Sequence, residues 1–244
     1  EEPSLKVNWD SKSEEIQINV MGTIQLEILK SMLWDRFNYK VDFASPDIIY
    51  KETISNQVRG YGHFEPLKHY AEVHLKIEAG ARNSGIVFSN QASTDDLSRG
   101  LQNLVRQHIL EKEHRGILTG SLLTDLKITL LTGRAHNKHT SGGDFKEATY
   151  RALRQGLEKA DNLLLEPFYS FKIKVELDYL GRVISDIEKA KGSFDSPEIK
   201  GEKAVIRGQA PVAKFMNYPV ELRTFTGGRG IIKLKFSGYD ICHN

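Results

Sequence analysis

The sequence predicts an α+β protein made of several small domains. Segments with a strand-like alternation of apolar and polar residues are interspersed with segments whose apolar residues recur at helical spacing. Residues 164–244 give the order strand, helix, strand, strand, helix, strand, and Glu166-Pro167 marks a boundary before them. The length of 244 residues suits two or three small domains.

The front of the chain predicts strands with a single helix. Residues 15–20 alternate as a strand, and Thr23 to Phe37 carry one apolar stripe at helical spacing. Val41 and Phe43 alternate as a further strand. Because one helix has to cover about three strands, we expect part of the apolar face of this block to lack a cover.

The middle of the chain predicts two longer helices and further strands. Residues 71–77 alternate cleanly. The run from Ser93 to Asp96 resembles a capping box before the apolar stripe of residues 97–109. Residues 126–130 alternate again, and Asp144 is expected to cap a helix that presents small residues on one face.

The last third predicts a complete small domain. Residues 171–175 alternate as a strand, and Asp178 is expected to cap the helix that follows. Two strands surround the turn at Pro197, and a helical stretch is interrupted at Pro219. Residues 231–236 form the last strand. This order predicts a ferredoxin-like domain, a fold that hosts many functions.

Composition excludes several classes of protein. No apolar run reaches the roughly 18 residues that a membrane span needs, so no membrane partner is expected. The single Cys242 excludes an intramolecular disulfide framework, and a cytoplasmic location is expected. The net charge is +2, with an acidic excess at the front and a basic excess in the two parts behind it. The first residue is Glu, which indicates an excised or processed piece.

Six short strings occur in order along the chain. They are MGTIQLEIL at 21–29, YKETI at 50–54, YGHF at 61–64, LLLEP at 163–167, DYLGRV at 178–183 and LRTFTGGRG at 222–230. Each resembles a local signature of elongation factor G and of the ribosomal-protection tetracycline-resistance proteins. Together they identify the chain as similar to the C-terminal half, domains three to five, of such a translational GTPase.

The resemblance implies three domains and a partner. Residues 1–56 are expected to form a partial ferredoxin-like domain III that lacks its first strand and helix. Residues 57–163 correspond to domain IV, with a fold like domain 2 of ribosomal protein S5, and residues 164–244 to domain V, a complete ferredoxin-like domain. The implied partner is the ribosome, through rRNA and the A-site region, and the protein is expected to act as a monomer.

No phosphate-binding loop of the type G-x-x-x-x-G-K-[ST] occurs in the sequence. The glycine cluster at 227–230 lacks the Lys-Ser/Thr pair and follows a helix. We therefore expect no catalytic residue and no cofactor in this piece, with GTP and Mg in an N-terminal G domain outside it. The full-length protein is expected to be a GTPase.

Residues 133–143 occupy the place of the tip loop of domain IV. This loop carries acids in elongation factor G, whereas residues 133–143 contain none. The following Asp144-Phe145 resembles the tetracycline-protection branch. The resemblance and this difference favour ribosomal protection, and translocation by an elongation factor G paralogue stays as the alternative.

The tip loop has the chemistry of an RNA contact. Arg134 and Lys138 can neutralise phosphates, and His136 and His139 can stack on bases. Asn137 supplies donors and an acceptor for base edges. The predicted contact with rRNA at the decoding centre comprises these five residues together with Thr140 and Ser141. A zinc site is not expected, because no Cys or carboxylate stands at a useful spacing from the two His residues.

Four other residues are secondary candidates for ribosome contact. Arg82 and Asn83 follow Gly80 and form either a second contact loop or a plain hairpin turn. Arg182 and Arg229 lie where the family's fifth domain faces rRNA, although a surface salt bridge is an equal interpretation of either. A small acylphosphatase-like hydrolase is a third possible class, but its anion-cradling loop with Arg and Asn is not evident in the last domain.

Overall fold

The computed structural model describes residues 5–10, 14–20, 22–136 and 138–242. The chain divides into two compact units, which are described separately below. One unit consists of Ile49–Pro167 with Gly238–Asn244, and the other consists of Glu1–Ile48 with Phe168–Ser237. No helix among the described residues is long and apolar enough to cross a membrane.

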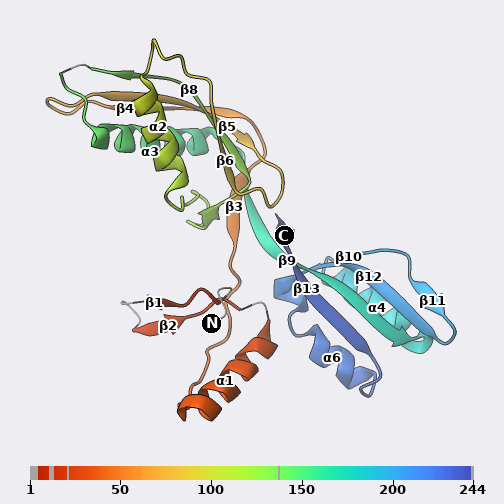
Figure 1. The fold of residues 1–244 in the computed structure, drawn as a ribbon. Helices are drawn as coiled ribbons and strands as arrows, with labels where there is room; N and C mark the ends of the chain where they lie inside the picture. Colours follow the sequence, from red (N-terminus) through yellow and green to blue (C-terminus); the bar gives the residue numbers. More distant parts are fainter. Residues whose placement is uncertain (1–4, 11–13, 21, 137, 243–244) are drawn as a thin grey trace. The chain divides into compact units, whose positions relative to one another are not determined.

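A four-stranded sheet with two helices forms the body of the first unit (Figure 1). The sheet has the order β4-β5-β8-β6. Neighbouring strands are antiparallel except for β6 and β8, which are parallel and are connected through α2. The elements are β4 (Val58–Phe64), β5 (Ala71–Ala79), β6 (Ile86–Asn90), α2 (Arg99–Leu110), β8 (Leu126–Ala135) and α3 (Gly142–Lys159).

The core of this unit lies between the sheet and its helices. Along β5 the side chains of Ala71, Val73, Leu75 and Ile77 are buried, and the intervening ones are partly exposed. This is the alternation of a sheet with one covered face, so the predicted strand at 71–77 is confirmed. The helix α3 packs on β4 and β5, and α2 packs on α3 and β6.

Two short ladders and the end of the chain extend this unit. The strands β3 (Lys51–Ile54) and β7 (Leu122–Leu123) are parallel, and β3 also pairs antiparallel with the first residues of β9 (Asn162–Glu176). The end of the chain joins the same unit, because the Cys242 N–H donates to the Leu164 carbonyl oxygen (3.0 Å). The predicted last strand is therefore longer than expected, since β13 (Ile231–Ile241) continues past Phe236.

The second unit contains the predicted ferredoxin-like domain. Its strands follow the order β10-β12-β9-β13, with β11 also paired to β12. The helices α4, α5 and α6 and the inward residues of the strands enclose a separate core. The elements are α4 (Leu177–Lys189), β10 (Ser193–Phe194), β11 (Glu198–Lys200), β12 (Lys203–Pro211), α5 (Val212–Phe215) and α6 (Tyr218–Phe225). The predicted break in the helical stretch is confirmed, with Pro219 in the first turn of α6.

The front of the chain has little core of its own. It contains the antiparallel pair β1 (Asn8–Asp10) and β2 (Glu15–Gln17) and the helix α1 (Thr23–Phe37), which has the predicted bounds. None of the residues up to Tyr50 whose burial is described is buried. The α1 side chains of Ile28, Met32 and Phe37 are exposed, although the sequence predicted that this helix would cover the strands of the block.

Three local predictions were wrong. No strand is described between α1 and β3, so the alternation at 41–43 does not form a ladder there. The helix α2 begins after Ser98 rather than at Ser93, whose hydroxyl instead accepts a hydrogen bond from the Asp95 N–H (3.1 Å). Asp178 lies in the first turn of α4, behind the N-cap Glu176. A Ser or Asp beside an apolar stripe can close a local turn or sit inside the helix just as well as it can cap it.

We expect residues 5–50 to exchange their amide hydrogens faster than residues 165–240. Segments with few buried apolar contacts open locally at low free energy, whereas the second region contains a closed core. Hydrogen exchange followed by mass spectrometry at several protein concentrations would measure both. Equally slow exchange in the two regions of a protein that stays monomeric would contradict this expectation.

Candidate nucleic-acid interface

The predicted tip loop connects the end of β8 to the start of α3. Arg134 lies on β8 opposite Glu72 of β5, and its side chain is exposed. His136, Lys138 and His139 lie in the loop itself and are at least partly exposed. Asn137 lies outside the described residues. The described part of the loop therefore presents two basic side chains and two imidazole rings to solvent.

Backbone hydrogen bonds fold the loop into a compact turn. The N–H groups of His139 and Thr140 both donate to the His136 carbonyl oxygen (3.1 Å each). The His136 N–H donates to Thr140 Oγ1 (2.7 Å). This turn brings the rings of His136 and His139 into a stack, with centroids 4.7 Å apart and planes 25° from parallel. The outer ring faces of such a pair are available to a further planar group.

A threonine fixes the loop to the adjacent sheet. The Thr140 hydroxyl donates to the Tyr70 carbonyl oxygen (2.7 Å), directly before β5 begins. The Lys138 N–H lies 3.3 Å from His136 Nδ1, which makes that nitrogen an acceptor. These contacts hold the His136 ring and the end of the loop in place. Thr140, predicted as a contact residue, has a positioning role in the structure.

A capping box ends the loop. Ser141, not Asp144, is the N-cap of α3: its N–H donates to Asp144 Oδ2 (2.7 Å), and its hydroxyl donates to Asp144 Oδ1 (2.9 Å). His69 Nδ1 also lies 2.8 Å from Asp144 Oδ1. Asp144 is buried, which acts to raise its pKa, but the hydrogen bonds from Ser141 and His69 together hold that pKa below its usual value.

The buried Asp144 carboxylate affects whether the N-terminus of α3 can bind an external anion. The N-terminus of a helix generally favours an external anion. Asp144 already places a negative charge inside the first turn. The cations and rings of the loop, rather than the N-terminus of α3, therefore remain as the groups that can meet RNA.

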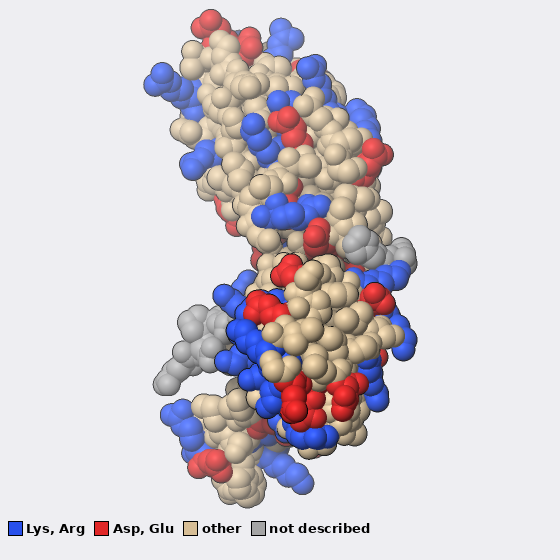
Figure 2. Space-filling view, turned by 90° about the vertical axis from the view of Figure 1, so that its right-hand side faces the viewer, with Lys and Arg blue, Asp and Glu red and all other residues tan. Residues whose placement is uncertain are grey.

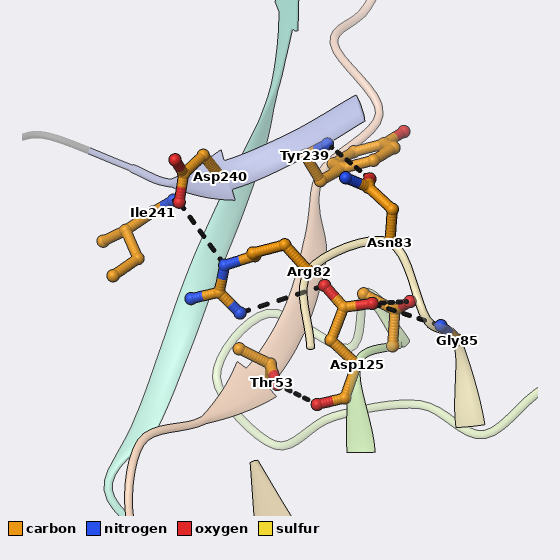
Figure 3. Close-up of polar contacts among 9 residues, drawn as sticks. Thr53, Arg82, Asn83, Gly85, Asp125, Tyr239, Asp240 and Ile241 are labelled. Atoms are coloured by element: carbon orange, nitrogen blue, oxygen red, sulfur yellow. Dashed lines mark hydrogen bonds and ion pairs between the residues drawn. The ribbon is translucent and has the colours of Figure 1, made fainter. Parts of the chain in front are cut away.

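Arg82 and Asn83 hold the end of the chain instead of projecting freely (Figure 3). Arg82 Nε lies 3.4 Å from Asp240 Oδ1, and its Nη1 lies 3.8 Å from the buried Asp125. Asn83 Oδ1 accepts the Tyr239 N–H (3.1 Å). Asn83 has a positive φ of 62°, as in a tight turn. The sequence left two interpretations of Arg82 and Asn83 open, a second contact loop and a plain hairpin turn. Neither anticipated that this segment binds the C-terminal strand.

The two arginines predicted in the second unit also have local partners. Arg182 lies over the Phe225 ring (4.0 Å to its centroid) and near Asp186 (3.8 Å). Arg229 pairs with Glu176 (2.9 Å) and donates to the Tyr179 hydroxyl (2.9 Å). Their role as ribosome contacts stays a prediction, and the structure does not bring them together with the tip loop in one unit.

Three residues that support the loop were not among the predicted site residues: Tyr70, His69 and Asp144. The spacing Ser141-x-x-Asp144 is the signal that could have identified the capping box. Tyr70 acts through its backbone carbonyl and lies 70 positions from Thr140, so no local pattern indicates it. Among the described residues no group of three His, Cys, Asp or Glu side chains is placed to hold a metal ion.

Comparisons with known proteins place the chain from residue 46 onward in one class, that of translation elongation factors. Residues 46–161 match the family model of elongation factor G, domain IV, and residues 163–244 match that of the elongation factor G C-terminus. The chain therefore belongs to the elongation factor G-like proteins.

Two individual proteins are similar over nearly the whole chain. The tetracycline resistance protein TetP of Clostridium perfringens is 32% identical over 241 residues, which cover 98% of this chain and 37% of TetP. The crystal structure of ttk003000868 from Thermus thermophilus matches with a TM-score of 0.78 and 27% identity, over 98% of this chain and 36% of that one. The chain thus spans little more than a third of the length of either protein.

Proposed function

We propose that this chain is the ribosome- and rRNA-binding C-terminal portion of a translational GTPase that protects the ribosome from tetracycline. The observation that carries the proposal is the tip loop, which is basic, free of acids from Gly133 to Gly143, and held in a defined shape. The similarity to a protein named for tetracycline resistance also supports this proposal.

The loop contacts the decoding centre in this proposal. RNA bases that are unstacked from their helix are recognised by stacking on planar side chains, and the His136–His139 pair offers ring faces for this. Arg134 precedes that pair and Lys138 lies between its two residues in the sequence, and both can neutralise backbone phosphates. Because Thr140 and Ser141 fix the loop at its end, little conformational entropy is lost when it binds.

GTP hydrolysis belongs to the rest of the protein in this proposal. A G domain in the full-length chain would hold GTP and Mg, and its nucleotide state would control when the tip loop enters the A site. The described residues would contribute binding and shape rather than a catalytic group. The protein would act in the cytoplasm as a monomer on one ribosome.

Replacing Arg134, His136, Lys138 and His139 together by Ala should weaken ribosome binding at least about tenfold, because two phosphate contacts and the stacking pair are lost. In the full-length protein, the same change should abolish tetracycline resistance in a susceptible bacterium. Folding should survive, since exposed-loop substitutions usually change stability by less than about 0.5 kcal/mol. Thr140 and Ser141 stay intact so that the loop keeps its anchors.

A double variant, Arg154→Ala with Lys159→Ala, is the matched control, because it removes two exposed cations from the other end of α3. Ribosome sedimentation would compare binding, and the minimal inhibitory concentration of tetracycline would report resistance. Unchanged resistance in the loop variant would refute the role of the loop. Rescue of translocation by the wild-type protein without any resistance would favour the elongation factor G paralogue instead.

A further inference from the structure

The four-stranded sheet of the first unit ends in an open edge at β6. The order β4-β5-β8-β6 makes β6 an outer strand that pairs with β8 along one edge only. At the two ends of this parallel ladder, the Gly85 carbonyl oxygen accepts the Leu126 N–H (3.0 Å) and the Gln91 N–H donates to the Leu130 carbonyl oxygen (2.9 Å). Alternate residues of a strand bond to opposite sides. The residues whose main-chain groups point to the open edge are therefore Ile86, Phe88 and Asn90.

The two outer edges of this sheet are treated differently. On β4, side chains of α3 satisfy the outward groups: the Tyr61 N–H donates to Gln155 Oε1 (2.8 Å), and the His63 carbonyl oxygen accepts from Arg151 Nη1 (2.9 Å). On β6, the main-chain groups of Ile86 and Phe88 form no bond to a loop or helix within the described part of the chain. Only the β6 edge is therefore left to pair with a further strand.

The sequence of β6 lacks the features that protect an open edge. Such edges are commonly blunted by charged side chains, proline or a bulge. The run from Asn83 to Thr94 contains no charged residue and no proline, and the β6–β8 register is continuous. Figure 2 shows side chains of both charges scattered over the upper part of that view, with uncharged surface between them. No field of a single sign therefore opposes pairing between like copies.

We propose that two copies of this chain associate by pairing their β6 strands edge to edge and antiparallel. Phe88 is the central residue of β6 and one of the three whose groups point outward. A twofold axis at this residue places Phe88 opposite Phe88 of the second copy, and Ile86 opposite Asn90 of the second copy. All three outward residues then enter hydrogen-bonded pairs, and the two sheets become continuous.

The charges at the ends of the uncharged run favour a second copy in this orientation. Arg82 precedes the run, and Asp95 and Asp96 follow it. Both aspartates are exposed, and a third of the Arg82 side chain (33%) remains exposed beside Asp240. Antiparallel pairing brings the basic end of each copy toward the acidic end of the other, so the attraction occurs twice. A twofold contact of this kind uses the same patch on both copies. The dimer is a state of the free protein and does not depend on the proposed function.

A charge-swap experiment tests the pairing. In the proposed register, residue 87 of one copy lies opposite residue 89 of the other, so Val87→Lys with Ser89→Lys places like charges directly opposite each other. Val87→Glu with Ser89→Glu does the same with negative charge. Ile86 and Phe88 pack on the core, so alternation places both substituted side chains on the other face of the sheet, and the fold should survive. Sedimentation velocity over a range of concentrations measures the dimer dissociation constant.

The wild-type chain should show a monomer–dimer equilibrium. Each charge variant alone should dimerise at least about tenfold more weakly, whereas an equimolar mixture of the two should form a dimer at least as tight as that of the wild type. Mixing cannot rescue a chain that has failed to fold, so this result separates lost pairing from lost structure. A wild type that stays monomeric at about millimolar concentration, or a mixture that does not associate, would overturn the proposal.

The exposed apolar face of α1, in the other unit, provides the control. Ile28→Lys with Met32→Lys adds the same charge there and should change the dissociation constant less than twofold. Loss of the dimer in this variant, with the β6 variants unchanged, would assign the contact to α1 and refute the pairing of β6. Amide exchange followed by NMR adds a second readout. The outward amides of Ile86 and Phe88 should exchange more slowly as the protein concentration rises, and an exchange rate independent of concentration in the dimer would also refute the pairing.

Discussion

Replacing Glu52 by Ala is expected to lower the free energy of unfolding by about 3–5 kcal/mol. The Glu52 side chain is completely buried and accepts hydrogen bonds from the N–H groups of Leu118, Thr119 and Ser121 (2.8–3.0 Å) and from the Thr119 hydroxyl (3.0 Å). Removal of the carboxylate leaves the N–H groups of Leu118 and Thr119 without this acceptor, whereas the Ser121 N–H and the Thr119 hydroxyl each keep one other partner, Thr119 Oγ1 and Ser121 Oγ. Urea unfolding followed by circular dichroism would measure the loss.

The pH dependence of the free energy of unfolding tests whether the negative charge of Glu52 causes this stabilisation. Burial acts to raise the pKa of Glu52, but the hydrogen bonds from Leu118, Thr119 and Ser121 outweigh it and leave that pKa below its usual value. A carboxyl group with a lowered folded-state pKa stabilises the protein above its unfolded-state pKa, and this contribution is lost as the pH falls through the folded-state value. The stability difference between the wild type and Glu52→Gln should therefore shrink from about pH 5 downward.

Glu158→Ala is the matched control. Glu158 is exposed on α3 and pairs only with Arg154 (3.0 Å) among the described residues, so its removal should change stability by less than about 0.5 kcal/mol. A Glu52→Ala variant as stable as Glu158→Ala would show that the carboxylate does not organise the loop at 116–121. A difference between wild type and Glu52→Gln that stays constant with pH would show that shape, not charge, is responsible.

The sequence predicts a helix or strand best where the apolar periodicity of that segment alone determines it. The stripe from Thr23 to Phe37 predicted α1 with the observed bounds, and the alternation at 171–175 lies within β9. Val41 and Phe43 show the same alternation but form no ladder in the described structure. A strand needs a partner strand, and local periodicity does not indicate whether one is present.

The tip loop shows the same difference between what local sequence predicts and what distant contacts decide. The polar, basic character of the tip loop could be predicted because it depends on composition alone. Its shape depends on Tyr70, and the place of Arg82 and Asn83 depends on Tyr239 and Asp240, more than 150 positions away. Such contacts arise from the topology of the whole unit. A rule based on a short window of sequence cannot supply them.

The second large effect is expected at Gly62, where β4 contacts α3. A Cβ atom on Gly62 would lie 1.8 Å from the Ala148 carbonyl oxygen and 2.6 Å from the Ala152 nitrogen. Both are backbone atoms of α3, which cannot move aside as a flexible side chain can. Gly60, two residues earlier on β4, meets Ala152 in the same way (1.9 Å). The helix therefore lies directly on the strand, and only glycine fits between them.

Gly62→Ala should accordingly lower the free energy of unfolding by about 3 kcal/mol or more, at or above the upper end for overpacked cores. Gly100→Ala should instead raise the free energy of unfolding, and it serves as the control. Gly100 lies in α2, nothing stands within 4 Å of its Cβ position, and alanine favours a helix over glycine by up to about 1 kcal/mol. Because α3 starts at the end of the tip loop, the proposed function implies that Gly62→Ala should also weaken ribosome binding at temperatures where the protein stays folded. If Gly62→Ala unfolds at the same urea concentration as the wild type, α3 does not rest on β4 as closely as described.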